Sequence, residues 1–171
     1  MAVKSKVICQ ISLIVDDVEA VTRNYVETFG LDMPEIRNLP KADTVPAYMD
    51  GVPGDYSDCR MAVLQFENMV FEITEPGAGE SPWRRWLDQH GPGVQHIGFM
   101  IEEADKDEAL ATLSGKGGKL YHAGFYPDLT YTFVDGVKSF GGLDFNIKWH
   151  TDNKEKIQDM LAHPEKRLET L

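Results

Sequence analysis

The chain has 171 residues, near the usual size of one domain and enough to bury a hydrophobic core without disulfides or a structural metal. Its balance of 42% hydrophobic and 26% charged residues excludes general disorder, collagen and coiled coils. The net charge is −11. Binding to nucleic-acid phosphates depends on clustered Lys and Arg side chains, which are scarce here, so no nucleic-acid partner is expected.

The first half of the chain predicts a strand, a helix, a loop and a hairpin in that order. Residues 7–15 predict a strand, after which Asp16-Asp17 begins a helical pattern that Gly30 ends. Residues 31–58 are rich in proline and glycine, which predicts a long loop with short extended pieces. Residues 60–66 and 69–74 predict a hairpin.

The second half predicts a similar series after a short helix. Ser81-Pro82 is typical of a helix start, and Gly91-Pro92-Gly93 ends that helix. Residues 94–101 predict a strand, and the acidic run from 102 predicts a helix to about 114. Residues 130–134 and 143–149 predict the last hairpin. From 151 onward the chain is polar, with a short helical pattern that we expect to fray.

The two halves align as an internal repeat. Residues 10–17, QISLIVDD, match 96–103, HIGFMIEE, in polarity at every position except Ser12 against Gly98, where both residues are small. Near the end of each half, Phe71-Glu72-Ile73 lies opposite Phe145-Asn146-Ile147. Each half therefore reads as one strand, one helix and two or three further strands, used twice.

Strand alternation assigns these residues to two faces of the predicted sheet. One face is apolar and is expected to pack against the helices, leaving the helices outside a curved sheet. The other face is a mixture of polar, small and flexible residues, which we expect to line a cavity or to face water. Its members are Gln10, Ser12, Ile14, Val70, Glu72, Thr74, His96, Gly98, Met100, Asp144, Asn146 and Lys148.

The segments 93–99, GVQHIGF, and 141–147, GGLDFNI, resemble the vicinal oxygen chelate superfamily of glyoxalase, bleomycin-resistance and dioxygenase proteins. Within it, the pattern is most similar to methylmalonyl-CoA epimerase and glyoxalase I. The resemblance covers about 7–149 and implies an α+β fold, with two βαβββ repeats forming a curved mixed sheet around a central pocket. We expect a single domain over 1–171, with repeats at about 7–75 and 94–149, a linking helix at about 81–90 and a polar tail at about 150–171.

The resemblance also implies a position for a metal. In metalloenzymes of this superfamily, the first and last strands of each half each supply one ligand to a divalent ion. Those positions here are Gln10, Glu72, His96 and Asn146. Glu72 and His96 agree with the pattern, whereas the two carboxamides stand where histidine and glutamate are common and supply no charge. An ion of Mn, Co, Zn, Ni or Mg would be held mainly by Glu72 and His96; the alternative is a hydrogen-bonded pair in a polar pocket.

Further pocket candidates are Ser12, Met100, Lys148, Tyr131 and Phe133. Lys148 either meets an anionic substrate or reaches solvent, and the two aromatic residues either wall the pocket or pack beneath a helix. Solvent exposure is expected for the remaining histidines, which are given no role: His90, His122, His150 and His163. Trp83 and Trp86 suit the core or a subunit contact, and a homodimer is expected because members of the superfamily usually pair.

Three functions follow from the resemblance and the residues. The first is a metal-dependent isomerase, epimerase or lyase that abstracts a proton next to a carbonyl of a small oxygen-chelating substrate, with Glu72 as a candidate base. The second is a metal-free protein that binds or sequesters a small molecule, as bleomycin-resistance proteins do. The third is a metal-free acid/base enzyme that uses Glu72 and His96.

No segment is long and apolar enough for a transmembrane helix, and the first residues lack the apolar core of a signal peptide. We therefore expect no membrane partner and a cytoplasmic location. Cys9 and Cys59 are too few for a disulfide framework, so both are expected to be packed thiols.

Overall fold

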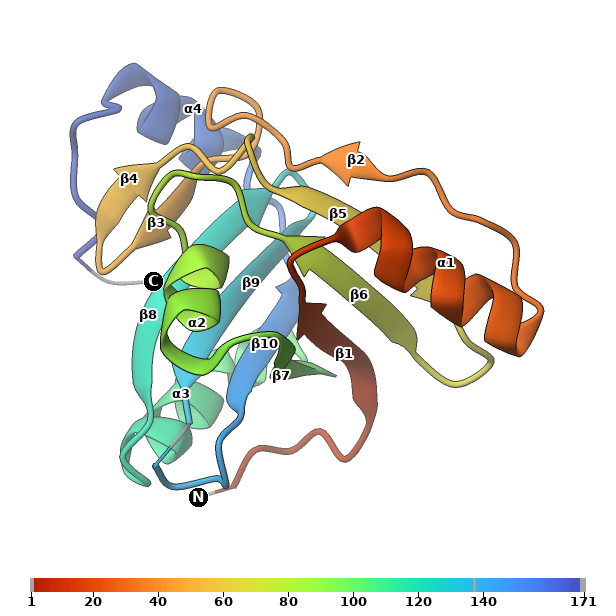
Figure 1. Ribbon diagram of the computed structural model, residues 1–171. Helices are drawn as coiled ribbons and strands as arrows, with labels where there is room; N and C mark the ends of the chain where they lie inside the picture. Colours follow the sequence, from red (N-terminus) through yellow and green to blue (C-terminus); the bar gives the residue numbers. More distant parts are fainter. Residues whose placement is uncertain (1, 137, 170–171) are drawn as a thin grey trace.

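The computed structural model describes residues 2–136 and 138–169. Within these ranges, ten strands form one mixed sheet that curls into a half-barrel, with α1 and α3 on its outer side (Figure 1). The strand order is β2-β5-β6-β1-β7-β10-β9-β8-β3-β4. This architecture confirms the predicted α+β fold with a curved sheet. None of the helices in these ranges has the length and hydrophobicity needed to cross a membrane.

The elements of the first half are β1 (Ile8–Ile14), α1 (Val18–Phe29), β2 (Arg37–Asn38), β3 (Ala47–Met49), β4 (Val52–Gly54), β5 (Arg60–Gln65) and β6 (Val70–Glu75). Helix α2 (Pro82–His90) links the halves. The second half contains β7 (Gly93–Met100), a 3-10 turn (Glu103–Asp105), α3 (Lys106–Ser114), β8 (Lys119–Tyr126), β9 (Leu129–Asp135), β10 (Asp144–His150) and α4 (Lys154–Ala162).

The two halves have the same strand register, which agrees with the repeat alignment. The first strands of the halves, β1 and β7, lie antiparallel at the middle of the sheet. Each pairs in parallel with the last strand of its own half, β1 with β6 and β7 with β10. Gln10 lies opposite Val70 in one pair, and His96 lies opposite Asp144 in the other. The alignment of residue 10 with 96 and of 70 with 144 is therefore also a spatial equivalence.

The outer, apolar face of the sheet is covered by α1 in the first half and by α3 in the second. Under α1 the buried residues include Val18, Ala62 and Ile73. Under α3 they include Leu113 and Ile147. Helix α1 begins where Asp17 accepts a hydrogen bond from the Ala20 amide at 2.9 Å, and it ends at Gly30 in the left-handed conformation. The face that the alternation predicts as apolar is thus the one that the helices cover.

Helix α2 packs across the concave side, and the burial of its two tryptophans confirms the core alternative and excludes the other. Trp83 and Trp86 are 3% and 8% exposed and lie in a core cluster with Tyr56 and Phe133. A side chain this deeply buried within the subunit offers no surface to a second copy. The proposed subunit contact through the two tryptophans is therefore wrong, because helical spacing identifies an apolar face but not what covers it.

Strand β8 was not predicted, and its position changes the role expected of His122. The strand pairs with β9 on one side and with β3 on the other, so the hairpin of β3 and β4 extends the sheet of the opposite half. His122 is 1% exposed, in contact with the rings of Trp83 and Phe133. Its expected solvation is therefore wrong, and burial lowers its pKa to about 3, which keeps the imidazole neutral.

The tail also forms a helix that packs against the sheet; residues 170 and 171 lie outside the described ranges. Helix α4 places Ile157, 8% exposed, against Tyr48 and Phe125. Asn153 precedes the helix and donates hydrogen bonds to the Tyr126 carbonyl at 2.8 Å and to the Thr130 hydroxyl at 2.9 Å. The expectation that this segment frays is wrong, since one apolar side chain and one amide tie it to the sheet.

Candidate functional site

Four polar side chains meet on the concave face of the sheet. Gln10 comes from β1, Glu72 from β6, His96 from β7 and Asn146 from β10, which are neighbours in the sheet order β6-β1-β7-β10. Three of the four are at most 3% exposed, whereas the Glu72 side chain is 17% exposed. The structure thus brings together the four residues that the repeat alignment selects, with Glu72 the most accessible of them.

Gln10 is the centre of a hydrogen-bond network. Its Nε2 donates to Glu72 Oε2 and lies 2.9 Å from His96 Nε2. Its Oε1 accepts a hydrogen bond from the Lys148 ammonium. Because a lysine can only donate, this contact fixes which end of the Gln10 amide is the oxygen. One carboxamide therefore connects a carboxylate, an imidazole and an ammonium.

The network also determines the tautomer of His96. Two amide nitrogens, Gln10 Nε2 at 2.9 Å and Asn146 Nδ2 at 3.4 Å, point at His96 Nε2. Both can only donate, so Nε2 is the accepting, unprotonated nitrogen, and Nδ1 donates to Gln95 Oε1 at 3.3 Å. Burial lowers the pKa of His96 well below its ordinary value, and the nearby Lys148 charge lowers that pKa further. His96 is a neutral acceptor that orients the two amides.

Glu72 and Lys148 are the two charged residues of the site. Burial raises the pKa of Glu72, while the Lys148 ammonium and the Gln10 hydrogen bond act in the opposite direction. The Glu72 Oε2 atom accepts from Gln10, and Oε1 accepts no hydrogen bond from any residue in the described ranges. A partly exposed carboxylate with a raised pKa and one free oxygen has the properties of a proton acceptor.

A cavity of about 240 Å³ lies against this network. One end is polar, where Glu72, Asn146 and Lys148 meet. The rest of the wall is apolar or aromatic and is formed by Leu39, Met61, Trp83, Tyr126, Leu129, Tyr131 and Phe133. Such a combination of an apolar pocket and a few convergent polar groups is typical of small-molecule sites.

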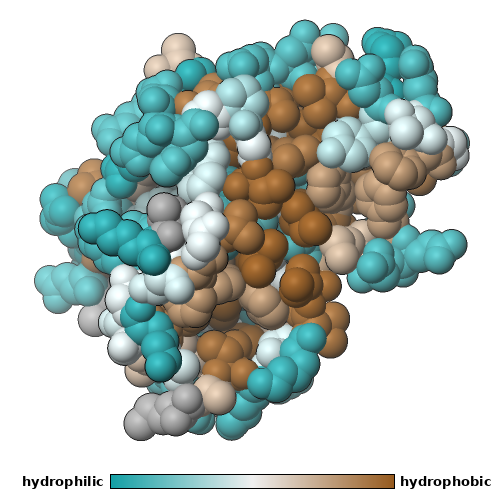
Figure 2. Space-filling view, turned by 60° about the horizontal axis from the view of Figure 1, so that its bottom comes forward, coloured by the Kyte–Doolittle hydropathy of each residue, from teal (hydrophilic) through white to brown (hydrophobic). Residues whose placement is uncertain are grey.

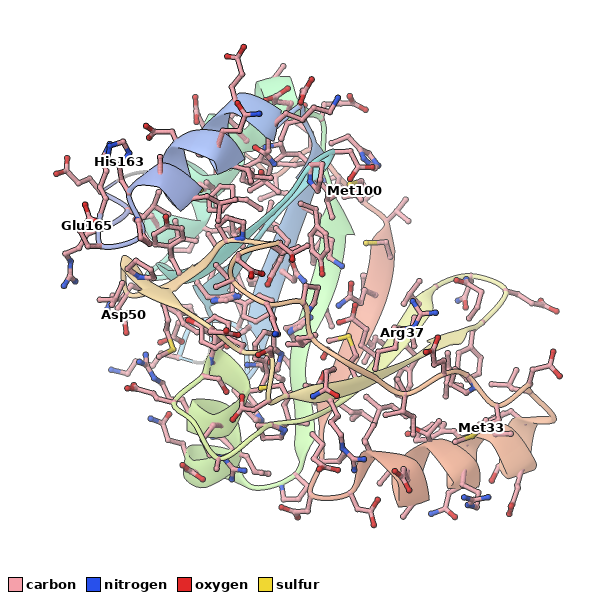
Figure 3. All side chains as sticks on the ribbon, turned by 90° about the horizontal axis from the view of Figure 1, so that it is seen from above. Met33, Arg37, Asp50, Met100, His163 and Glu165 are labelled. Carbon is pink, nitrogen blue, oxygen red and sulfur yellow. The ribbon has the colours of Figure 1, made fainter. Side chains whose placement is uncertain are left out.

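The predicted pocket residues divide into two groups. Lys148, Tyr131 and Phe133 line the cavity, as does Asn146. Ser12 and Met100 do not line it: Ser12 is fully buried on β1, and Met100 is the last residue of β7 (Figure 3). Five further lining residues were not predicted for the pocket: Leu39, Met61, Trp83, Tyr126 and Leu129. Leu39 lies in a loop and Tyr126 in an unpredicted strand, and the local pattern of these residues does not indicate a pocket.

A divalent ion does not fit the four-residue set as the structure arranges it. Both amides present N–H groups to the His96 nitrogen that a metal would need. The Gln10 oxygen, the donor that a hard cation would use, is occupied by the ammonium of Lys148. Glu72 is the one carboxylate of the set, and in the described ranges no three His, Cys, Asp or Glu side chains cluster in a way that could hold a metal.

A second buried network supports the site from beneath. The Tyr121 hydroxyl donates to Asp144 Oδ2 at 2.7 Å, and the Gly136 amide donates to Asp144 Oδ1 at 3.2 Å. Gln95 Nε2 donates to the Pro82 carbonyl at 3.4 Å and lies 3.5 Å from the Tyr121 hydroxyl. Through Gln95, which accepts from His96, this network holds the imidazole of the site in place.

The chain belongs to the Glyoxalase/Bleomycin resistance protein/Dioxygenase superfamily, whose family model matches residues 9–133. This confirms the resemblance inferred from the sequence. Superfamily members commonly bind divalent metals, so the arrangement described above departs from that pattern at Gln10 and Asn146. No curated protein matched the sequence.

Solved structures share the fold at low sequence identity. A hypothetical protein, BH1468, from Bacillus halodurans C-125 has a TM-score of 0.59 at 17% identity, over 85% of this chain and 94% of the other. Methylmalonyl-CoA epimerase from Mycobacterium tuberculosis has a TM-score of 0.58 at 15% identity, over 91% and 95% of the two chains. A Streptomyces coelicolor methylmalonyl-CoA epimerase variant in complex with 2-nitronate-propionyl-CoA has a TM-score of 0.55 at 20% identity, over 85% and 95%.

Proposed function

We propose that this protein is an isomerase of the epimerase type, which abstracts a proton from the carbon next to a carbonyl of a small substrate. The observation that carries the proposal is Glu72, a partly exposed carboxylate at the polar end of an otherwise apolar cavity. A general base must reach the substrate proton, and Glu72 has a free oxygen for this purpose. The methylmalonyl-CoA epimerases that share the fold suggest 2-substituted acyl thioesters as the first substrates to test.

In the proposed reaction the substrate C–H bond breaks and its proton moves to Glu72. The electron pair of that bond forms the carbon–carbon double bond of an enolate, and the carbonyl pair moves onto oxygen. Inversion requires a proton from water to be added on the opposite face of the enolate carbon, after which Glu72 gives its proton up to water. Return from Glu72 to the same face restores the configuration, and it incorporates a solvent hydrogen if the carboxyl proton of the partly exposed Glu72 has first exchanged with water. The aromatic wall, including Tyr131 and Phe133, would exclude water from the enolate.

Solvent deuterium incorporation tests this proposal without requiring knowledge of the product. Methylmalonyl-CoA and a panel of 2-substituted acyl thioesters and 2-hydroxy ketones would be incubated in D₂O with the protein and followed by mass spectrometry. We expect one deuterium at the carbon next to the carbonyl, and a loss of about 100-fold or more in Glu72→Gln, in line with general-base contributions. The matched control is Glu67→Gln, which changes an exposed carboxylate between β5 and β6.

The pH dependence of the exchange rate identifies the base. Glu72 acts as a base only when it is ionised, and burial raises its pKa above the ordinary value of 4.5. The rate should therefore rise with pH through a midpoint above 4.5 and then level off. The sequestering function would be favoured instead if a ligand of the panel bound in the cavity and showed no exchange at any pH.

A further inference from the structure

Lys148 is the charged group of the site that the superfamily pattern leaves unexplained. Its side chain is half-buried on β10, two residues after Asn146, and therefore on the same concave face. Its ammonium donates to Gln10 Oε1 and lines the cavity beside Glu72. In the described ranges no carboxylate lies within ion-pair distance of it, so a neutral amide positions this cation. Two of its three N–H groups remain available to the cavity.

We propose that the Lys148 ammonium is a built-in cation that takes the place of a divalent ion in this site and binds the carbonyl oxygen of the substrate, where the enolate charge develops. The part of this inference that concerns the enolate rests on the proposed function. The part that assigns Lys148 as the cation of the site rests only on the arrangement of the side chains. Lys148 would hydrogen-bond the carbonyl oxygen while Glu72 removes the neighbouring proton.

The charges of the site support this assignment. Glu72 and Lys148 carry opposite unit charges, and they cancel before the reaction. When the proton moves from carbon to Glu72, the carboxylate becomes neutral and the enolate oxygen takes up the negative charge. The ammonium then faces the enolate in place of the carboxylate, so the total charge of the cavity does not change. A preorganised cation at the position where charge develops is an efficient way to stabilise such an intermediate.

The same contacts explain why a metal and the ammonium exclude each other. The Gln10 oxygen that would coordinate a cation already accepts from Lys148. A divalent ion placed among Gln10, Glu72 and His96 would lie beside a half-buried ammonium, where charges of like sign repel strongly. Removing the ammonium should therefore free the oxygen and relieve the repulsion at once.

Metal binding to purified, chelator-treated protein tests the cation role without any substrate. Mn²⁺ would be titrated into the parent, Lys148→Met and Lys116→Met, with free Mn²⁺ measured by electron paramagnetic resonance. Methionine is similar to lysine in length but neutral, and Lys116→Met removes one exposed charge far from the cavity. We expect a gain in Mn²⁺ affinity of at least about tenfold in Lys148→Met, because a repelling unit charge has gone, and none in Lys116→Met.

A double variant shows whether the gained Mn²⁺ binds in this site, and a spectroscopic check shows whether each variant is folded. Lys148→Met combined with His96→Ala should lose the gained Mn²⁺ affinity, and circular dichroism would show that each variant is folded. Tight one-to-one binding of Mn²⁺ to the parent, or no gain in Lys148→Met, would overturn the cation role. Neither result depends on whether a substrate has been found.

The catalytic role is tested on any substrate that exchanges deuterium. Exchange by the parent should be unaffected by a chelator, should fall about 100-fold or more in Lys148→Ala, and should be partly rescued in that variant by methylamine. Loss of the parent's exchange in chelator, or unchanged exchange in Lys148→Ala, would overturn the role. If no substrate exchanges, the proposed function fails, while the Mn²⁺ titrations still decide whether Lys148 acts as the cation.

Discussion

A carboxamide at residue 10 gives this site a different chemistry from the histidine that is common at the equivalent position in the superfamily. Gln10 is both donor and acceptor, so it binds Glu72 and His96 through its nitrogen and Lys148 through its oxygen. An imidazole has only one nitrogen that can face the cavity and cannot make these contacts together. The residue identity therefore decides between a network of hydrogen bonds and a metal site.

Asp144 provides a prediction about stability and pH. It is 3% exposed, and burial raises its pKa to about 6, although Tyr121 and Gly136 donate to it. Because the folded pKa exceeds the ordinary value of 3.8, the stability that protonated Asp144 contributes is fully present below about pH 4 and is lost as the pH rises through 6. The loss amounts to at most about 3 kcal/mol.

The free energy of unfolding in urea, measured at pH 4, 5, 6 and 7.5, tests this prediction for the parent and Asp144→Asn. Relative to the variant, the parent should lose stability as the pH rises, mostly between pH 4 and 6. Asp128→Asn, at an exposed turn residue, serves as the control for replacing an aspartate by asparagine away from the buried network. A pH-independent difference for Asp144→Asn would contradict the shifted pKa.

Strand β8 shows how one element depends on its neighbours. Its centre, His122-Ala123-Gly124, has low strand propensity, yet β3 and β9 pair with it on both sides. Gly124 lies under the ring of Tyr131, where a Cβ atom would come within 2.2 Å of that ring. The glycine is thus required by the cross-strand tyrosine that lines the cavity, and a propensity argument on β8 alone cannot find this strand.

Substitution of Gly124 by alanine should therefore displace Tyr131. The ring would lose its place in the cavity wall and the hydrogen bond of its hydroxyl with His122 Nε2, now 3.1 Å. We expect a loss of about 1–3 kcal/mol in the free energy of unfolding, as for other overpacked sites. Gly93→Ala is the matched control, since a Cβ atom at Gly93 meets no atom within 4 Å. Equal stability of the two variants in urea would show that Tyr131 is not held by this contact.

At the scale of the whole molecule, the sequence predicts the four central strands of the sheet and the meeting of the four side chains, because both follow from a period of two repeated in two halves. Gln10 and His96 lie at equivalent positions, as do Glu72 and Asn146. The orientation of the amides and the contact of Lys148 with Gln10 are not predictable in this way. They depend on which donors and acceptors face one another across strands that are distant in sequence, and no spacing encodes that choice.

Apolar residues are partly exposed at the join of the two halves of the sheet. Ile11 and Ile97 lie opposite each other on β1 and β7 and are half-buried, and Ile8 and Val94 nearby are 39% and 36% exposed. On the face that comes forward from the bottom of Figure 1, hydrophobic residues gather in a band bordered by hydrophilic ones (Figure 2). We call the four named residues the join surface.

The join surface is where we expect a second copy of the chain to bind, now that the tryptophans are excluded from that role. A contiguous apolar patch is costly to expose, and two copies related by a twofold axis would cover it mutually. Each chain carries a net charge of −11, so association should strengthen with salt, which screens the repulsion between the copies.

Sedimentation velocity over about 5–200 µM protein should give a dimer that Val94→Glu converts to a monomer, because a buried carboxylate without a partner is unfavourable. Leu161→Glu, at a residue 42% exposed on α4, adds the same charge elsewhere and should leave the dimer intact. A parent that sediments as a monomer at every concentration and salt would instead mean that the join surface faces water.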